Sequence, residues 1–244
     1  MSIESSEGYI KMAPFFKALT EKQLGVDVPE EVLSAWTNLS LTLRAADHLI
    51  DRARDVDLRK KIIDQGLSFL LGGVDEISGD EEYTSSMSAL RSNLTGLPEG
   101  RRGNFFRNLR KLLSVTEEIK TTSSPDNLAL LTRLEGQITA RLFLNLLPAE
   151  YEEIPNYQNC LKIATRLGRA GNAFDTFIDL PGDYRNGELS VAPTLRNRLV
   201  LLRESAPDSA FALVNIGPNM IRRIGDGIIL TLKKRPSNQV TPNQ

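Results

Sequence analysis

Hydrophobic positions recur with a helical period along nearly the whole chain, and no alternating strand pattern persists. Ile10, Ala13, Phe16 and Leu19 illustrate the repeat near the beginning. Pro29, followed by two glutamates, is typical of a helix start. The expected helices cover residues 9–24, 29–55, 57–71, 81–94, 104–119, 126–147, 157–179, 195–203 and 210–233.

Glycine, proline and short polar runs separate these segments. Residues 180–190 are rich in such breakers and predict a loop, and Pro218 predicts a kink or break in the last helix. The connections are short, and we find no internal repeat. We therefore expect one all-α domain, a helical bundle, over residues 1–244, with residues 235–244 as a frayed polar tail.

Composition narrows the possible chemistry. The 244 residues are 41% hydrophobic and 25% charged, and 30 basic residues against 31 acidic ones leave a net charge of −1. This balance argues against a nucleic-acid partner. One basic stretch surrounds Phe105 and Phe106, and we interpret it as a solvated face; its members are Arg101, Arg102, Arg107, Arg110 and Lys111. A single cysteine, Cys160, and a single histidine, His48, exclude disulfide frameworks, cysteine-rich zinc sites and histidine-pair metal sites.

The first residues are acidic and polar, without the basic start and apolar run of a secretion signal. No window reaches 18 apolar residues. We expect a cytoplasmic protein without stable membrane insertion.

An aspartate ladder marks the second expected helix. Asp47, Asp51 and Asp55 are spaced i, i+4, i+8 and share one helix face. Stacked carboxylates repel one another, so a partner should compensate. One candidate is a solvated lattice of salt bridges with Arg44, Arg52 and Arg54. The same stripe continues backward through Arg44, Ser40 and Trp36. Arg44 is expected either to neutralise the aspartates or to contact an anionic ligand.

Asp175, Asp179 and Asp183 repeat the same spacing further along the chain. Gly168 and Gly171 precede them on the same face. These glycines either allow another helix to approach closely or leave room for a ligand.

Two facing ladders would suit Mg²⁺, which prefers oxygen ligands and accepts a few carboxylates together with waters and phosphate oxygens. The bound ions would clamp a diphosphate and stabilise its departure. Ionisation of an allylic diphosphate leaves a carbocation, which aromatic faces attract. Trp36, Phe143, Phe174 and Phe177 are placed to line such a cavity, or else they belong to an ordinary core.

The first acidic stretch reads Arg44-x-x-Asp47-x-x-x-Asp51. The second reads Leu167-Gly-x-Ala-x-Asn172-x-x-Asp175-x-x-x-Asp179-x-x-x-Asp183-x-x-x-Gly187 and is followed by Pro193. Both resemble the aspartate-rich motifs of the squalene/phytoene synthase family. The resemblance implies an all-α isoprenoid synthase fold with a central cavity that binds prenyl diphosphates through Mg²⁺. It matches Asp47 and Asp51 to the first motif and Asp179 and Asp183 to the second. Asp175 and Asn172 stand where the family usually has Asn and Gln.

The chain also departs from this pattern. His48 stands where the family often has a second acid, and Ile178 replaces a common arginine. Pro181 and Gly182 predict that the helix is interrupted before Asp183. Residues 139–146 lack the glycine pair of head-to-head synthases, and the chain after the second motif is short. These departures favour resemblance to the phytoene-synthase-like aromatic prenyltransferases of carbazole antibiotic pathways.

The expected activity is a Mg²⁺-dependent prenyltransferase of secondary metabolism, which transfers a prenyl group from an allylic diphosphate to a small, carbazole-like aromatic acceptor. The metal residues expected are Asp47, Asp51, Asp175, Asp179 and Asp183, of which all but Asp183 are also expected to be catalytic. The expected diphosphate contacts are Arg44, Arg141, Arg185 and Asn172, and the expected pocket residues are Trp36, Ser40, Phe143, Gly168, Gly171 and Phe174. The alternatives are a head-to-head synthase, a class I terpene cyclase and a non-catalytic helical binding module. A homodimer is one of the assemblies left open.

Overall fold

A computed structural model describes the backbone of residues 6–53 and 55–233, and the side chains of residues 12–53 and 55–215. All of the regular structure in this part of the chain is helical, which confirms the expected all-α class. The helices are α1 (Ser6–Leu24), α2 (Glu30–Arg52), α3 (Val56–Leu71), α4 (Glu81–Thr95), α5 (Glu99–Thr121), α6 (Pro125–Asn145), the short 3₁₀ helix η2 (Ala149–Glu153), α7 (Tyr157–Asn186) and α8 (Leu195–Lys233).

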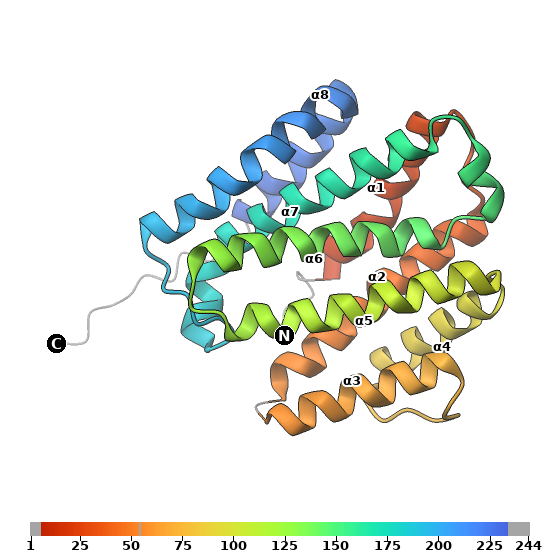
Figure 1. The fold of residues 1–244 in the computed structure, drawn as a ribbon, viewed down its shortest axis with the longest axis horizontal. Coiled ribbons are helices and arrows are strands. Elements are labelled where there is room, and N and C mark those ends of the chain that lie inside the picture. The colour runs from red at the N-terminus through yellow and green to blue at the C-terminus, as the bar shows by residue number, and fades with distance from the viewer. Residues whose placement is uncertain (1–5, 54, 234–244) are drawn as a thin grey trace.

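Four helices lie side by side in chain order, α5, α6, α7 and α8 (Figure 1). Helices α1 and α2 lie behind this row, and the α3–α4 hairpin packs against α2 at the lower edge of the view. Because α5 and α6 are antiparallel neighbours, the end of α5 and the beginning of α6 meet at one end of the bundle. Helix α7 also ends there (Figure 1).

Several helix ends are fixed by local side-chain chemistry. The Asp55 carboxylate accepts a hydrogen bond from the backbone N–H of Asp57 and caps α3, and Asp80 caps α4 in the same way. Ser124 caps α6, with Pro125 in its first turn. Gly72 ends α3 with φ +81°, in the left-handed region that favours glycine.

Aromatic side chains fill the centre of the bundle. The rings of Phe16 and Phe143 stack with centroids 4.4 Å apart, and the Trp36 indole N–H donates to the Phe143 carbonyl at 2.6 Å. Trp36, Phe143 and Ser40 have no accessible surface, so they border no space large enough for water. The Ser40 hydroxyl bonds to the Trp36 carbonyl of its own helix. The expectation that these three residues line a substrate pocket is therefore wrong, because they are packed against one another and their own backbone.

Helix α7 continues through Pro181 and Gly182 to Asn186, so the expected loop over residues 180–190 begins later than predicted. A proline removes the hydrogen bond to the carbonyl four residues earlier, here that of Phe177. The Arg198 guanidinium of α8 donates to this carbonyl through Nε at 3.1 Å. A partner from another helix thus compensates for the proline, which the local sequence could not show. Helix α8 likewise runs without the break expected between residues 203 and 210.

Arg101 belongs to the basic stretch that we interpreted as a solvated face, but it is only 6% exposed. Its guanidinium donates to the carbonyls of Leu144 and Leu147 at the end of α6 and pairs with Glu152 at 2.9 Å. The cation therefore satisfies the Leu147 carbonyl just beyond the helix end and adds a second donor to the Leu144 carbonyl, which already accepts from the Leu147 backbone N–H. The other members of the stretch are exposed, as expected.

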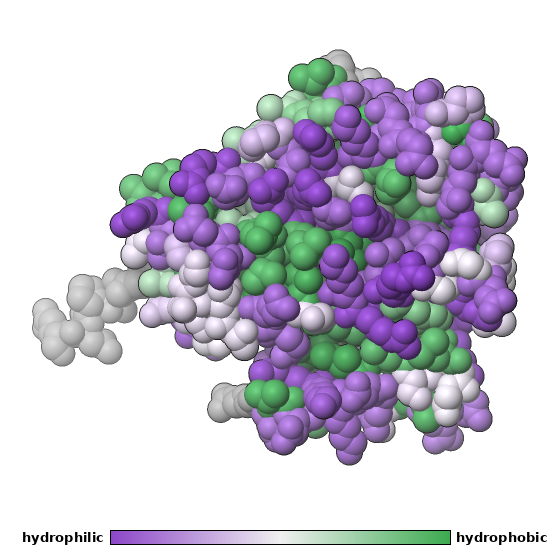
Figure 2. All heavy atoms as spheres, viewed as in Figure 1, coloured by the Kyte–Doolittle hydropathy of each residue, from purple (hydrophilic) through white to green (hydrophobic). Residues whose placement is uncertain are grey.

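The face formed by α5, α6 and α7 is mostly hydrophilic, with apolar side chains gathered in its middle and in a second band lower down (Figure 2). No helix in the described part of the chain combines the length and the apolar character that a membrane crossing requires.

Candidate functional site

Asp47 and Asp51 lie one turn apart near the end of α2. Asp55, the third member of the sequence ladder, does not continue this face, because α2 ends at Arg52 and Asp55 caps α3 instead. The first ladder therefore has two rungs. Its spacing was correctly predicted from sequence up to the point where the helix ends.

Asp175, Asp179 and Asp183 lie on successive turns of α7. The sequence predicted that Asp183 would leave the helix after Pro181, and this prediction is wrong because α7 extends to Asn186. All three aspartates thus share one face of the helix. Asp175 is exposed, whereas Asp179 and Asp183 are half-buried.

The two ladders lie within electrostatic range of each other. The pKa of Asp183 is raised to about 7, first by burial and then by the negative charges of Glu188, Asp175, Asp51 and Asp47. Two of these charges belong to α2 and one to α7 itself. The fold thus brings the acids of both motifs to one region of the bundle, although Asp47 and Asp179 are 132 positions apart in the sequence.

The pKa of Asp47, on α2, is raised as well. Burial raises its pKa to about 7, with a further contribution from the charge of Asp51, while the Lys120 ammonium opposes the shift. Asp47 nevertheless keeps an exposed surface. Water therefore still reaches this residue. Such a position is open to a small cation or anion.

A half-buried acid of α6 completes the cluster and was missed from sequence. Glu135 accepts hydrogen bonds from the Thr116 hydroxyl at 2.7 Å and from the Asn172 amide at 2.6 Å. Burial is the main reason that its pKa is raised, and the charge of Asp175 adds to it. The available signal was an acid beside the apolar stripe of α6, namely Leu131, Leu134 and Ile138.

Lys120 of α5 is the second residue that sequence analysis missed. Its Nζ lies 2.6 Å from Oδ1 of Asp51, and the side chain is 15% exposed. Its charge lowers the pKa of both Asp47 and Glu135, against the effects of burial. The expected helix stopped at residue 119, one residue short of this lysine, whereas α5 continues to Thr121.

The residues expected to contact diphosphate are mostly engaged elsewhere. Arg44 pairs with Glu82 of α4 at 2.9 Å, so it does not neutralise the aspartates of its own helix. Arg185 donates to the Pro181 carbonyl of α7 at 3.0 Å. Asn172 donates to Glu135 and to the Thr132 carbonyl. Arg141 is exposed on α6.

The two glycines of α7 have different roles. Gly168 lies directly against the backbone of Gly136 in α6, which leaves no room for a side chain on either residue. Close helix approach, one of the two interpretations open from sequence, therefore explains Gly168. Gly171 is exposed, with open space where a Cβ would lie. Phe174 stacks on Phe177, with ring centroids 6.1 Å apart.

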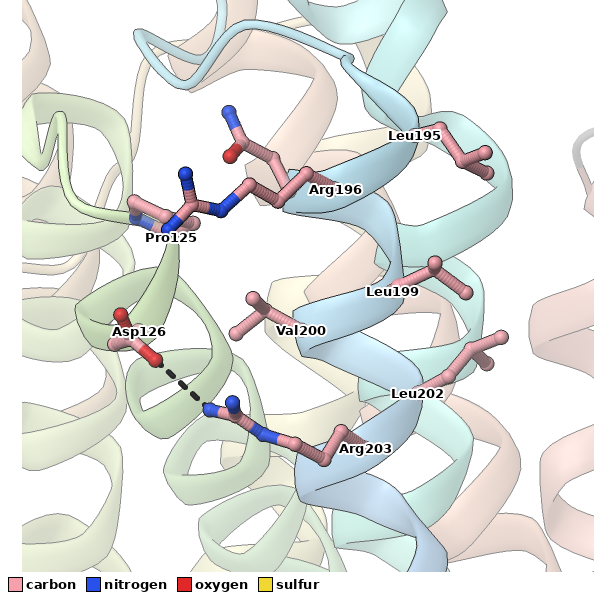
Figure 3. A pocket seen from close by; sticks show the side chains of 9 residues that line it. Pro125, Asp126, Leu195, Arg196, Leu199, Val200, Leu202 and Arg203 are labelled. Carbon is pink, nitrogen blue, oxygen red and sulfur yellow. Dashed lines mark hydrogen bonds and ion pairs between the residues drawn. The ribbon is translucent and has the colours of Figure 1, made fainter.

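A groove of about 1040 Å³ lies between the beginnings of α6 and α8 (Figure 3). Val200, Arg196 and Arg203 of α8 point toward α6, and Arg203 pairs across the groove with Asp126 at 3.0 Å. Leu195, Leu199 and Leu202 point to the other side of α8 (Figure 3). With these leucines included, the groove is lined mainly by apolar side chains, but none of the residues expected in the site belongs to it, and we place no site there.

The chain matches no family model, no curated protein and no solved structure. Fold and site together define an all-helical protein with a partly hydrated acidic region between α2, α6 and α7. In this article, the acidic site means Asp47, Asp51, Glu135, Asp175, Asp179, Asp183 and Glu188, together with Lys120.

Proposed function

We propose that this protein binds Mg²⁺ and the diphosphate group of an allylic prenyl donor at the acidic site, and that it transfers the prenyl group to a small aromatic acceptor. The observation that carries the proposal is that acids of both ladders act on one carboxyl group: after burial, the charges of Asp175 on α7 and of Asp51 and Asp47 on α2 raise the pKa of Asp183. Carboxylates that raise one another's pKa are stabilised by a cation placed among them.

The donor set fits a hard divalent cation. Within the described residues, no three acidic, histidine or cysteine side chains surround a single point as a complete metal cage. Mg²⁺ does not require one, because it commonly binds through one or two carboxylates and completes its shell with waters and phosphate oxygens. Asp47 or Asp51 of α2 would supply one such carboxylate, and one of Asp175, Asp179 and Asp183 of α7 would supply the other. When bound, the ion supplies positive charge that stabilises a departing diphosphate.

In this proposal the protein's own residues position the carboxylates and orient Glu135. The two rigid helices hold the carboxylates in position before the ligand arrives, so no loop has to be ordered on binding. The Asn172 amide and the Thr116 hydroxyl orient Glu135. No strong protein base is needed, because the released diphosphate can accept the proton that the aromatic acceptor loses. We assign no residues to the prenyl tail, since Trp36 and Phe143 lie in the packed core.

Binding of inorganic pyrophosphate tests the proposal without assuming a donor or an acceptor. Calorimetry should show pyrophosphate binding in MgCl₂ and none in excess chelator. Asp51→Asn and Asp183→Asn should weaken this binding at least tenfold, because each removes a carboxylate that the ion would use, whereas circular dichroism should remain unchanged. Asp75→Asn is the matched control, since the Asp75 side chain is 97% exposed on the loop after α3. Full binding in either site variant, or in chelator, would contradict the proposal.

The reaction products would distinguish a prenyltransferase from a head-to-head synthase or a terpene cyclase. Incubation with allylic diphosphates of increasing chain length, with and without an aromatic acceptor, should give an alkylated acceptor only when both substrates are present. A hydrocarbon formed from the diphosphate alone would indicate a head-to-head synthase or a terpene cyclase instead.

One observation favours a function of a different class, a non-catalytic helical binding module. The stacked rings of Phe16 and Phe143 fill the centre of the bundle, where a class I synthase would need an apolar cavity. Such a module would show no Mg²⁺-dependent binding of pyrophosphate in the calorimetric experiment above.

A further inference from the structure

The Lys120 ammonium lies against a carboxylate that the proposed metal ion would use. Lys120 lies in the last turn of α5, and its ammonium donates to Oδ1 of Asp51 at 2.6 Å. The backbone carbonyl of the same residue accepts a hydrogen bond from the Ser190 hydroxyl, at 3.3 Å, from the segment that follows α7. Lys120 is therefore connected to α2 through its side chain and to the segment after α7 through its backbone.

The charge of Lys120 extends beyond its ion pair. It lowers the pKa of Asp47 on α2 and of Glu135 on α6, in both cases against burial and neighbouring acids. A group of partly buried carboxylates is unfavourable without positive charge among them. Lys120 supplies such charge from within the chain.

The same ammonium competes with a divalent ion. Asp51 Oδ1 is an oxygen that Mg²⁺ would use, and an ammonium and a metal ion at one carboxylate oxygen would repel each other strongly at such short range. The lysine side chain is a flexible four-carbon stem, so it can leave Asp51 while the backbone of α5 stays in place. Once displaced, the ammonium remains beside the anionic ligand.

We propose that Lys120 is the internal counterion of the acidic site: it neutralises Asp51 while no divalent ion is bound, and it moves from Asp51 to the diphosphate when Mg²⁺ binds. This role rests on the proposed function, because it belongs to the same site. It also identifies a cation for the diphosphate, since Arg44 is paired with Glu82 and Arg185 is bound to its own helix.

Lys120→Met tests the proposal with two measurements that should change in opposite directions. Calorimetry with MgCl₂ alone should show at least tenfold tighter metal binding in the variant, because the competing charge is gone. With Mg²⁺ held at saturation, inorganic pyrophosphate should bind at least tenfold more weakly, because its cationic contact is gone. A purely structural ion pair would not produce this opposite pair of shifts. Lys111→Met, an exposed lysine of the same helix, should change neither affinity.

Conservative variants complete the experiment. Lys120→Arg keeps the charge and should restore both affinities to within a few fold of the original protein. Lys120→Gln removes the charge but keeps a hydrogen-bond donor, and it gives the same test if Lys120→Met does not fold. Equal Mg²⁺ affinity in the original protein and the uncharged variant would overturn the role of Lys120 and leave the proposed function standing. Absence of both Mg²⁺ and pyrophosphate binding from every variant would overturn the proposed function as well.

Discussion

At the scale of single residues, the fold keeps two carboxyl groups of the acidic site protonated at pH values where free aspartates are ionised. Asp47 and Asp183 have pKa values raised to about 7, with burial as the largest cause and neighbouring acids as the next. In the unfolded chain the same groups titrate near their ordinary value of about 4. Between these two values the folded protein binds more protons than the unfolded chain does.

This difference predicts the pH dependence of stability in the presence of chelator. The stabilising contribution of protonated Asp47 and Asp183 is complete below about pH 4 and is lost as the pH rises toward about 7. The free energy of unfolding should therefore fall over this window. Because both groups are partly exposed, we expect a loss of about 1 kcal/mol for each rather than the full linkage value.

Urea unfolding of the original protein and of Asp47→Asn at pH 5 and pH 8 provides the measurement. The amide cannot ionise, so the variant should lose less stability between the two pH values than the original protein does. Asp64→Asn on the exposed face of α3 serves as the control and should keep the original difference. An unchanged difference in Asp47→Asn would show that the pKa of Asp47 is not raised in solution.

At the scale of helices, the crossing of α6 and α7 positions Glu135 beside Asn172. Gly136 and Gly168 bring the two backbones into direct contact, and a Cβ on Gly136 would also meet the Asn172 side chain at 2.8 Å. Backbone cannot move aside as a flexible side chain can. The crossing therefore depends on glycine at both positions and sets the distance across which the Asn172 amide reaches Glu135.

Alanine substitutions separate this packing role from helix propensity. An alanine in a helix is normally more stable than a glycine by about 1 kcal/mol. Gly136→Ala should nevertheless destabilise the protein by about 2 kcal/mol or more, because the added methyl group forces the helices apart. Gly171→Ala, with open space around it on α7, should stabilise by about 0.5–1 kcal/mol. Equilibrium unfolding in urea measures both, and equal effects of the two substitutions would exclude a packing role for Gly136.

At the scale of the whole molecule, a buried carboxylate connects α8 to the two helices that carry much of the acidic site. The Asp208 side chain is 4% exposed and accepts from Arg133 of α6 at 2.9 Å. Arg166 and Arg169 of α7 lie 3.8 and 3.9 Å from its other oxygen. The Arg166 guanidinium also lies over the Phe211 ring of α8, 4.2 Å from its centroid. Three helices thus converge on one charge.

Removing this charge should destabilise the fold, because it leaves the arginines without their shared counterion. Asp208→Asn keeps the shape of the side chain and should lower the free energy of unfolding by about 3 kcal/mol. Asp126→Asn removes the partner of Arg203 from a pair whose two side chains are 68% and 65% exposed, and it should cost less than about 1 kcal/mol. Thermal unfolding followed by circular dichroism compares the two, and similar losses would refute the structural role of Asp208.

Local periodicity was sufficient to predict much of the helical framework. The spacing of apolar residues identified most of the helices, and the i, i+4 spacing of the aspartates correctly placed Asp47 with Asp51 on α2 and Asp175 with Asp179 on α7. These features depend on residues within a few turns of one another. Prediction failed at Pro181, where Arg198 of a different helix compensates for the lost backbone hydrogen bond.

The sequence by itself therefore determined the all-helical class and the acidic faces of α2 and α7, because helix periodicity is a local property of the chain. Only the tertiary structure decided which groups meet: Trp36 and Phe143 in the core, Arg44 at Glu82, and Lys120 at Asp51. Each of these outcomes depends on side-chain direction and on contact between helices distant in sequence. No pattern within one helix encodes that information.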